Sequence, residues 1–188
     1  GGETEDDTFD PAFGRLFFGE GGARVVKAIR AVGALNALQD MARGNSSRGI
    51  YALLEDPVLA EISLSFSQET LQQIKETCEQ AETVFCQIPG DCQDRWALEE
   101  MAYSCRLFEL MARKATFSKR LDATLSNMSS VPKTAYDALT ALLEELDAID
   151  VALASLVSLF EAQWMRRARR SEINISLGHF AGMRERMR

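Results

Sequence analysis

All four cysteines of the chain lie within one stretch of 28 residues, at Cys78, Cys86, Cys92 and Cys105. Such a cluster can bind a metal ion, form a redox centre or form disulfide bonds. Structural zinc sites usually contain closely spaced pairs such as Cys-x2-Cys, whereas here the intervening segments hold 7, 5 and 12 residues, and His179 is the only histidine. Because no Cys-x-x-Cys pair is present either, the spacing argues against both a metal site and a catalytic redox centre.

The spacing does fit a helical hairpin that is held by two disulfides. An Ile-Pro-Gly-Asp sequence lies between Cys86 and Cys92 and predicts a tight turn between antiparallel helices. Cys78 and Cys105 then face each other across the hairpin, but only if the second helix begins near Arg95. We therefore predict the bridges Cys78–Cys105 and Cys86–Cys92. The alternative is that Cys78 and Cys105 are reduced core residues, because free cysteine is among the most buried residue types.

Three of the four asparagines begin an Asn-x-Ser sequon, namely Asn45, Asn127 and Asn174. Asn45 and Asn127 fall in predicted turns, where an attached glycan would be exposed. A local serine bias in turns is the alternative explanation. Together with the even number of cysteines, the sequons predict a secreted protein, or one in the lumen of the secretory pathway.

The segments that carry these residues have the apolar spacing of bundle helices. Apolar residues recur at alternating steps of three and four, which places one apolar stripe along each helix, and no comparable strand-like alternation occurs. We predict an all-α, elongated antiparallel helical bundle whose last long helix is ~60 Å long. The predicted long helices span about 66–88, 94–128 and 132–171, with an N-terminal helix at about 22–43 and a short helix at about 48–55.

The length of 188 residues suits one domain. We expect residues 1–12 to be a disordered acidic lead-in, 13–171 to form the bundle, and 172–188 to be a basic C-terminal tail. The glycine-broken aromatic segment Phe13–Leu35 is expected to pack against an end of the bundle. In Ser65-Phe-Ser-Gln68, a serine hydroxyl and the glutamine side chain are expected to cap the start of the first long helix.

The net charge of −7 conceals an uneven distribution of charge. Residues 164–188 contain seven Arg and two Glu, a net charge of +5, which leaves −12 for residues 1–163. An acidic body argues against nucleic-acid binding, which needs a basic face along the phosphates. The basic segment suits an anionic partner such as a lipid headgroup, a sulfated glycan or an acidic protein surface. Alternatively, its arginines offset the helix dipole and the acidic body. The candidate contact residues are Trp164, Arg166, Arg167, Arg169 and Arg170.

No set of side chains in the sequence forms a recognisable catalytic site, so we predict no catalytic residue, no metal ion and no cofactor. The leading hypothesis is a non-enzymatic secreted or cell-surface helical-bundle module that binds a partner protein. One alternative is a peripheral membrane protein that binds anionic lipid through the Arg-rich segment. Another is an all-α enzyme with a charged pocket inside the bundle. The three apolar stripes contain no charged residue, but Lys27 and Arg30 of the first helix leave that alternative open.

Overall fold

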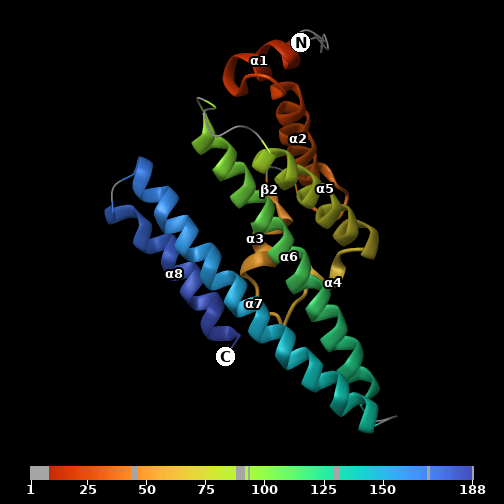
Figure 1. Cartoon of the computed structure of the whole chain (residues 1–188). Helices are drawn as coiled ribbons and strands as arrows, with labels where there is room; N and C mark the ends of the chain where they lie inside the picture. Colours follow the sequence, from red (N-terminus) through yellow and green to blue (C-terminus); the bar gives the residue numbers. More distant parts are fainter. Residues whose placement is uncertain are drawn as a thin grey trace.

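The computed structural model of the chain describes residues 9–43, 46–87, 92, 94–128, 132–168 and 170–187. These residues form eight α-helices and confirm the all-α prediction (Figure 1). The helices are α1 (Phe9–Phe18), α2 (Gly22–Ala34), α3 (Arg48–Leu54), α4 (Ile62–Ser65), α5 (Gln68–Gln87), α6 (Arg95–Asn127), α7 (Pro132–Arg167) and α8 (Arg170–Arg186). A 3-10 turn, Leu35–Ala37, follows α2, and the two-residue strands β1 (Ala42–Arg43) and β2 (Ser46–Ser47) pair antiparallel before α3.

The long helix α6 forms the centre of the molecule. Helices α5 and α7 pack on different flanks of α6, and α3 and α4 cover another part of its surface. Helix α8 runs alongside α7 (Figure 1). Helices α1 and α2 pack on each other, and α2 also packs on α5. The predicted apolar stripes are buried in these contacts, for example Ile74 of α5, Leu98 of α6 and Leu153 of α7.

Helices α1 and α4 were not among the predicted helices, and α1 begins at Phe9, inside the predicted lead-in of residues 1–12. Residues 1–8 of that lead-in lie outside the described residues. Two further segments differ from the predicted helix boundaries. The predicted N-terminal helix at 22–43 ends at Ala34, and the chain is extended at Leu38 after the 3-10 turn. The segment that was expected to be a basic tail is helical as α8, separated from α7 by a break at Ala168. Helix α8 buries Ile173 and Met183, so tertiary packing supplies the stability that its mixed sequence lacks.

The start of α5 is capped differently from the prediction. Ser67 is the capping serine, because its hydroxyl oxygen accepts a hydrogen bond from the backbone N–H of Thr70 at 3.1 Å. The carboxylate of Asp40 takes the place predicted for Gln68: it accepts bonds from the Ser67 N–H at 2.8 Å, the Ser67 hydroxyl at 2.7 Å and the Thr70 hydroxyl at 2.7 Å. These bonds, led by the one from the Ser67 backbone, lower the pKa of Asp40. A residue 27 positions before Ser67 therefore completes the cap of α5.

Helices α1 and α2 touch through their backbones at two glycines. A Cβ atom at Gly14 would lie 2.4 Å from the carbonyl carbon of Gly22, and one at Gly22 would lie 1.9 Å from the carbonyl oxygen of Gly14. The turn between the helices contains Gly19 and Gly21 at φ values of 71° and 86°, a region that glycine adopts without steric cost. The aromatic segment is therefore a close-packed helical hairpin.

None of the described helices combines the length and the apolar character that a membrane span needs.

Candidate functional site

The cysteines are thiols in the structure, and no pair of sulfurs lies at bonding distance among the described residues. Helix α6 begins at Arg95 and leaves Cys92 outside it, as the predicted hairpin requires. Cys78 and Cys105 are completely buried between α5 and α6. Their hydrogen bond, followed by burial, raises the pKa of the Cys78 thiol far above its ordinary value. Of the two possibilities weighed for this pair, the structure holds reduced core residues.

Cys86 and Cys92 likewise form no disulfide bond in the structure. Cys86 is exposed at the end of α5, while the Cys92 thiol donates a hydrogen bond to the backbone oxygen of Phe17 in α1, at 3.6 Å. Among the described residues, no group of three or more His, Cys, Asp or Glu side chains is arranged to hold a metal ion.

The sequon asparagines fall in different settings. Asn127 is exposed as the last residue of α6, where its side-chain amide donates to the Ala123 carbonyl at 2.8 Å. Asn174 is exposed on α8, in a helix and not in a turn. Asn45 lies outside the described residues.

The basic segment contacts two glutamates in the second turn of α6. Arg166 pairs with Glu99, and Arg167 pairs with Glu100 at 3.1 Å. The Arg167 guanidinium also lies 3.7 Å from the centre of the Trp96 ring, a cation–π contact. These arginines offset charge within the molecule, while their side chains stay partly exposed.

Of the other candidate residues of the basic segment, the structure describes the side chain of Trp164 only. Trp164 packs on Phe160 with ring centres 5.6 Å apart. Arg169 and the side chain of Arg170 lie outside the described part of the structure.

The C-terminal end of α3 is capped by a buried lysine, which was not among the candidate residues predicted from the sequence. Lys114 of α6 is 1% exposed and donates hydrogen bonds to the carbonyls of Ala52 at 3.0 Å, Leu53 at 2.7 Å and Glu55. Carbonyls at a helix C-terminus have no partner within the helix and carry its negative dipole end. Burial lowers the pKa of Lys114 to about 8.

The same region contains a second cap, which joins α3 to α4. The Glu55 carboxylate accepts hydrogen bonds from the backbone N–H groups of Ile62 at 3.1 Å and Ser63 at 2.6 Å, at the start of α4. The Arg186 guanidinium of α8 donates to the Leu54 carbonyl at 2.6 Å. Because carbonyls surround the Lys114 ammonium, we assign it a structural role and not a catalytic one.

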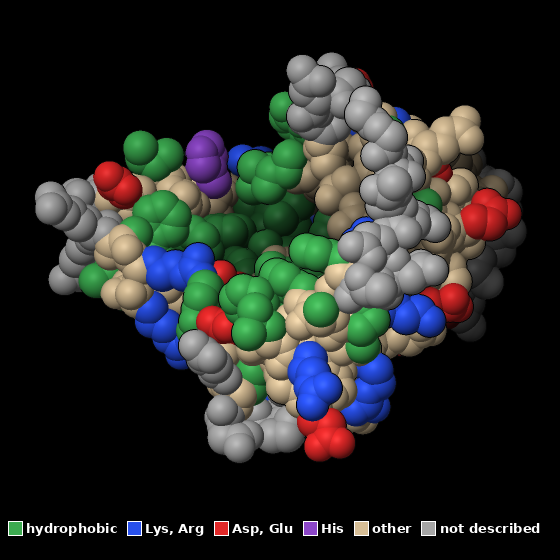
Figure 2. All heavy atoms as spheres, turned by 90° about the horizontal axis from the view of Figure 1, so that it is seen from above, with side chains coloured by type: hydrophobic (Ala, Val, Ile, Leu, Met, Phe, Trp, Pro, Cys, Tyr) green, Lys and Arg blue, Asp and Glu red, His purple; other side chains and the backbone are tan. Residues whose placement is uncertain are grey.

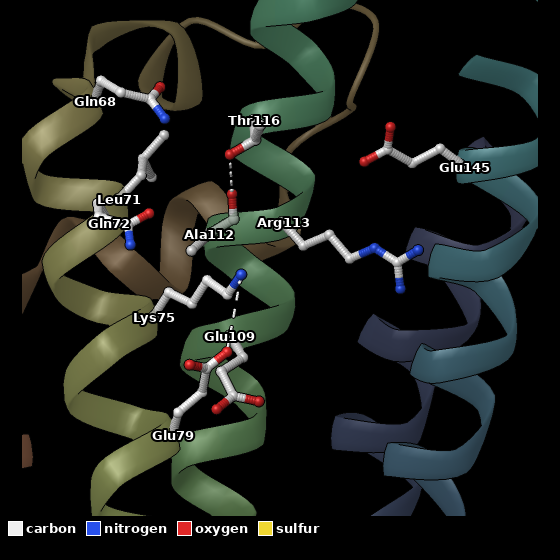
Figure 3. A pocket seen from close by; sticks show the side chains of 10 residues that line it. All are labelled: Gln68, Leu71, Gln72, Lys75, Glu79, Glu109, Ala112, Arg113, Thr116 and Glu145. Atoms are coloured by element: carbon white, nitrogen blue, oxygen red, sulfur yellow. Dashed lines mark hydrogen bonds and ion pairs between the residues drawn. The ribbon is translucent and has the colours of Figure 1, made fainter. Parts of the chain in front are cut away.

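A charged cleft lies between α5, α6 and α7 (Figure 3). Its volume is about 430 Å³, and a neighbouring space of about 380 Å³ between α6 and α7 shares two of its residues, Glu109 and Arg113. Ion pairs lie in and beside the cleft: Lys75–Glu79 at 3.8 Å, Arg106–Glu82 at 2.5 Å and Arg120–Glu145.

Both shared residues have polar atoms without a hydrogen-bond partner in the part of the chain that the structure describes. Oε1 of Glu109 is buried without a hydrogen-bond partner among the described residues. Burial, followed by the charges of Glu82 and Glu79, raises the pKa of the Glu109 carboxyl. The Arg113 side chain extends from α6 toward α7 in Figure 3 and forms no hydrogen bond or ion pair within the described part of the chain.

The charged cleft does not include Lys27 or Arg30, the two residues that had left a charged pocket inside the bundle open as an alternative. Arg30 is paired with Asp10 at 2.6 Å, and Lys27 is exposed on α2. The cleft residues lie beside the apolar stripe of α6, where Arg106, Glu109 and Arg113 are spaced by three and four. That second, charged stripe is a signal in the sequence for a charged face of α6.

An apolar pocket lies on another side of α6, against α3. Its volume is about 220 Å³, and its walls are mostly the hydrophobic side chains of Ile50, Leu53, Leu107, Phe108 and Met111. Figure 2 shows hydrophobic side chains gathered in a hollow of the molecule as seen from above. Ile50 is 52% exposed, so part of this apolar surface faces solvent.

Comparisons of the chain with protein families, with curated proteins and with solved structures found no match.

Proposed function

We propose that the chain is a non-enzymatic helical-bundle module that binds an amphipathic helix of a partner protein in the apolar pocket between α3 and α6. The observation that carries the proposal is the apolar lining of that pocket, of which Ile50 is 52% exposed. Exposed apolar surface around a depression commonly marks an interaction site.

The size of the pocket favours a protein partner over a small molecule. Small-molecule sites usually have volumes of ~300–1,000 Å³, whereas this pocket has about 220 Å³. That space suits one or two anchoring side chains. A helix presents such anchors at steps of three and four residues, a common way of binding a groove between helices.

The experiment places a photo-crosslinking residue, p-benzoylphenylalanine, at Ile50 in the chain expressed in its native source. We expect one discrete adduct whose crosslinked peptide comes from an amphipathic helix of another protein. The variant Ile50→Asp should weaken the complex by about tenfold or more, because it places a charge in the apolar contact. Val58→Asp is the matched control, since Val58 is a similarly exposed apolar residue outside the pocket.

Two outcomes would contradict the proposal. One is an adduct with a second copy of this chain, together with a change of oligomeric state in Ile50→Asp. The other is a complex whose affinity falls equally in Ile50→Asp and Val58→Asp.

Secretion is part of the proposal and is supported by the three sequons and the even number of cysteines. The exposed Asn127 and Asn174 side chains are accessible to a glycan. The expected result for natively expressed protein is an intact mass that falls on treatment with an N-glycosidase. Cys78 and Cys105 are in contact as thiols in the structure, and we propose that this pair is oxidised in the secretory lumen, so that reduction adds the mass of two hydrogens. A mass equal to that of the unmodified chain, unchanged by reductant, would exclude secretion by this route.

A further inference from the structure

The charged cleft between α5, α6 and α7 is large enough for a small molecule. Its volume of about 430 Å³ falls in the range of small-molecule sites, and the neighbouring space adds room along α6. Figure 3 shows side chains from all three helices around it, with Lys75 on one side and Glu145 on the other. Leu71 and Ala112 contribute apolar lining.

Two charged groups of the cleft have no partner among the described residues. Glu79, Glu82 and Glu145 each have a cation beside them. Arg113 has no such partner in the described residues, and Oε1 of Glu109 is buried without a hydrogen bond there. A buried polar atom without a partner destabilises the protein, so a ligand that supplies the missing hydrogen bond gains binding free energy.

The positions of the Arg113 guanidinium and of Oε1 of Glu109 indicate which functional groups a ligand should carry. Glu109 and Arg113 are four residues apart on α6, which places their Cβ atoms ~5–6 Å apart. In Figure 3 the Arg113 side chain points toward α7, away from Glu109. A guanidinium binds a carboxylate through two parallel hydrogen bonds. A carboxyl oxygen such as Oε1 of Glu109 accepts a hydrogen bond from an ammonium or a hydroxyl.

We propose that this cleft binds a small carboxylic acid with a hydrogen-bond donor on its α-carbon, that is, an α-amino or α-hydroxy acid. Arg113 holds the carboxylate of the ligand, and Oε1 of Glu109 accepts from its ammonium or hydroxyl. A polyanion such as a nucleotide does not suit the cleft, because the carboxylates of Glu79, Glu109 and Glu145 line it. The site lies on a different side of α6 from the apolar pocket, so it is independent of the proposed protein partner.

The test uses the whole chain and three probes of nearly equal size: alanine, lactate and propionate. All three carry a carboxylate, but only alanine and lactate have a donor on the α-carbon. Binding is measured by NMR titration of the Arg113 Nε–H and the Ala112 backbone amide. We expect alanine or lactate to bind at least about tenfold more tightly than propionate. The preferred probe identifies the donor as ammonium or hydroxyl.

Variants separate the two contacts. Arg113→Gln should weaken binding of the preferred probe by about tenfold or more, and Glu109→Leu should bring its affinity down to that of propionate. Arg15→Gln, an exposed arginine of α1 outside the cleft, should bind like the unaltered chain. The proposal is overturned if no probe shifts the Arg113 resonance, if propionate binds as tightly as the other two, or if Arg113→Gln binds unchanged. Thermal unfolding of each variant confirms that it is folded.

Discussion

Replacing Lys114 with methionine is expected to lower the free energy of unfolding by about 2–4 kcal/mol. Methionine fills a similar volume, but it has no hydrogen-bond donor. The carbonyls of Ala52, Leu53 and Glu55 therefore lose their partner in a buried environment. Loss of the bulk of the lysine stem contributes little, so the effect comes from the unsatisfied end of α3. Chemical denaturation monitored by circular dichroism measures the change.

The matched control is Lys119→Met, five residues further along α6. Lys119 also donates to a backbone carbonyl, that of Leu64 at 2.7 Å, but this bond is exposed, so water can replace it and the loss should stay below ~1 kcal/mol. Equal stability of Lys114→Met and the unaltered chain would contradict the assigned role of Lys114.

The pH dependence of stability gives a second measurement for Lys114. Its pKa falls from 10.5 in the unfolded chain to about 8 in the folded one. Between these values the unfolded state binds more protons, so the contribution of Lys114 to stability increases with pH from about 8 to 10.5, by at most ~1.4 kcal/mol per pH unit. The difference in stability between the unaltered chain and Lys114→Met should therefore widen as the pH rises from 7 to 10.

Replacing Gly14 with alanine is expected to undock α1 from α2 and to cost about 3 kcal/mol in that hairpin. The added Cβ would overlap the backbone of Gly22 and Ala23 at 2.4–2.7 Å, and a backbone cannot turn aside as a flexible side chain does. Hydrogen exchange should show lost protection in α1, while the amides of α5–α7 remain protected. This contrast separates local undocking from global unfolding.

Gly33→Ala is the control within the same hairpin. Gly33 lies in α2 with no atom within 4 Å of the added Cβ, so alanine should leave the chain unchanged or stabilise it by up to ~1 kcal/mol. Destabilisation by Gly33→Ala as large as that by Gly14→Ala would show that helix propensity, and not the close contact, sets the effect.

The long helices were predictable because their signal is local. The apolar spacing in α5, α6 and α7 repeats within each segment, and their predicted bounds agree with the structure to within two residues, except at the C-terminal end of α7. The hairpin between Cys78 and Cys105 followed from the same kind of reasoning. Spacing places two thiols in contact and led to the predicted bridges, but it does not determine whether the thiols are oxidised.

The remaining features depend on contacts between distant residues. Helix α8 is held by groups such as Arg184, which donates to Asp150 of α7 at 2.6 Å across 34 positions. Lys114 acquires its role only from α3, about 60 positions earlier in the chain. Glu109 and Arg113 form a pattern in the sequence, but the cleft around them exists because α5 and α7 occupy different flanks of α6. No local pattern predicts such contacts.

The central position of α6 has a consequence for synthesis of the chain. Helices α3 and α4 leave the ribosome before α6, the helix that they pack on. Until Lys114 emerges, the last carbonyls of α3 can bond only to water, and the apolar faces of these helices have nothing to cover them. Helices α3 and α4 therefore cannot pack stably until α6 has been synthesised, whereas α1 and α2 can already pack on each other.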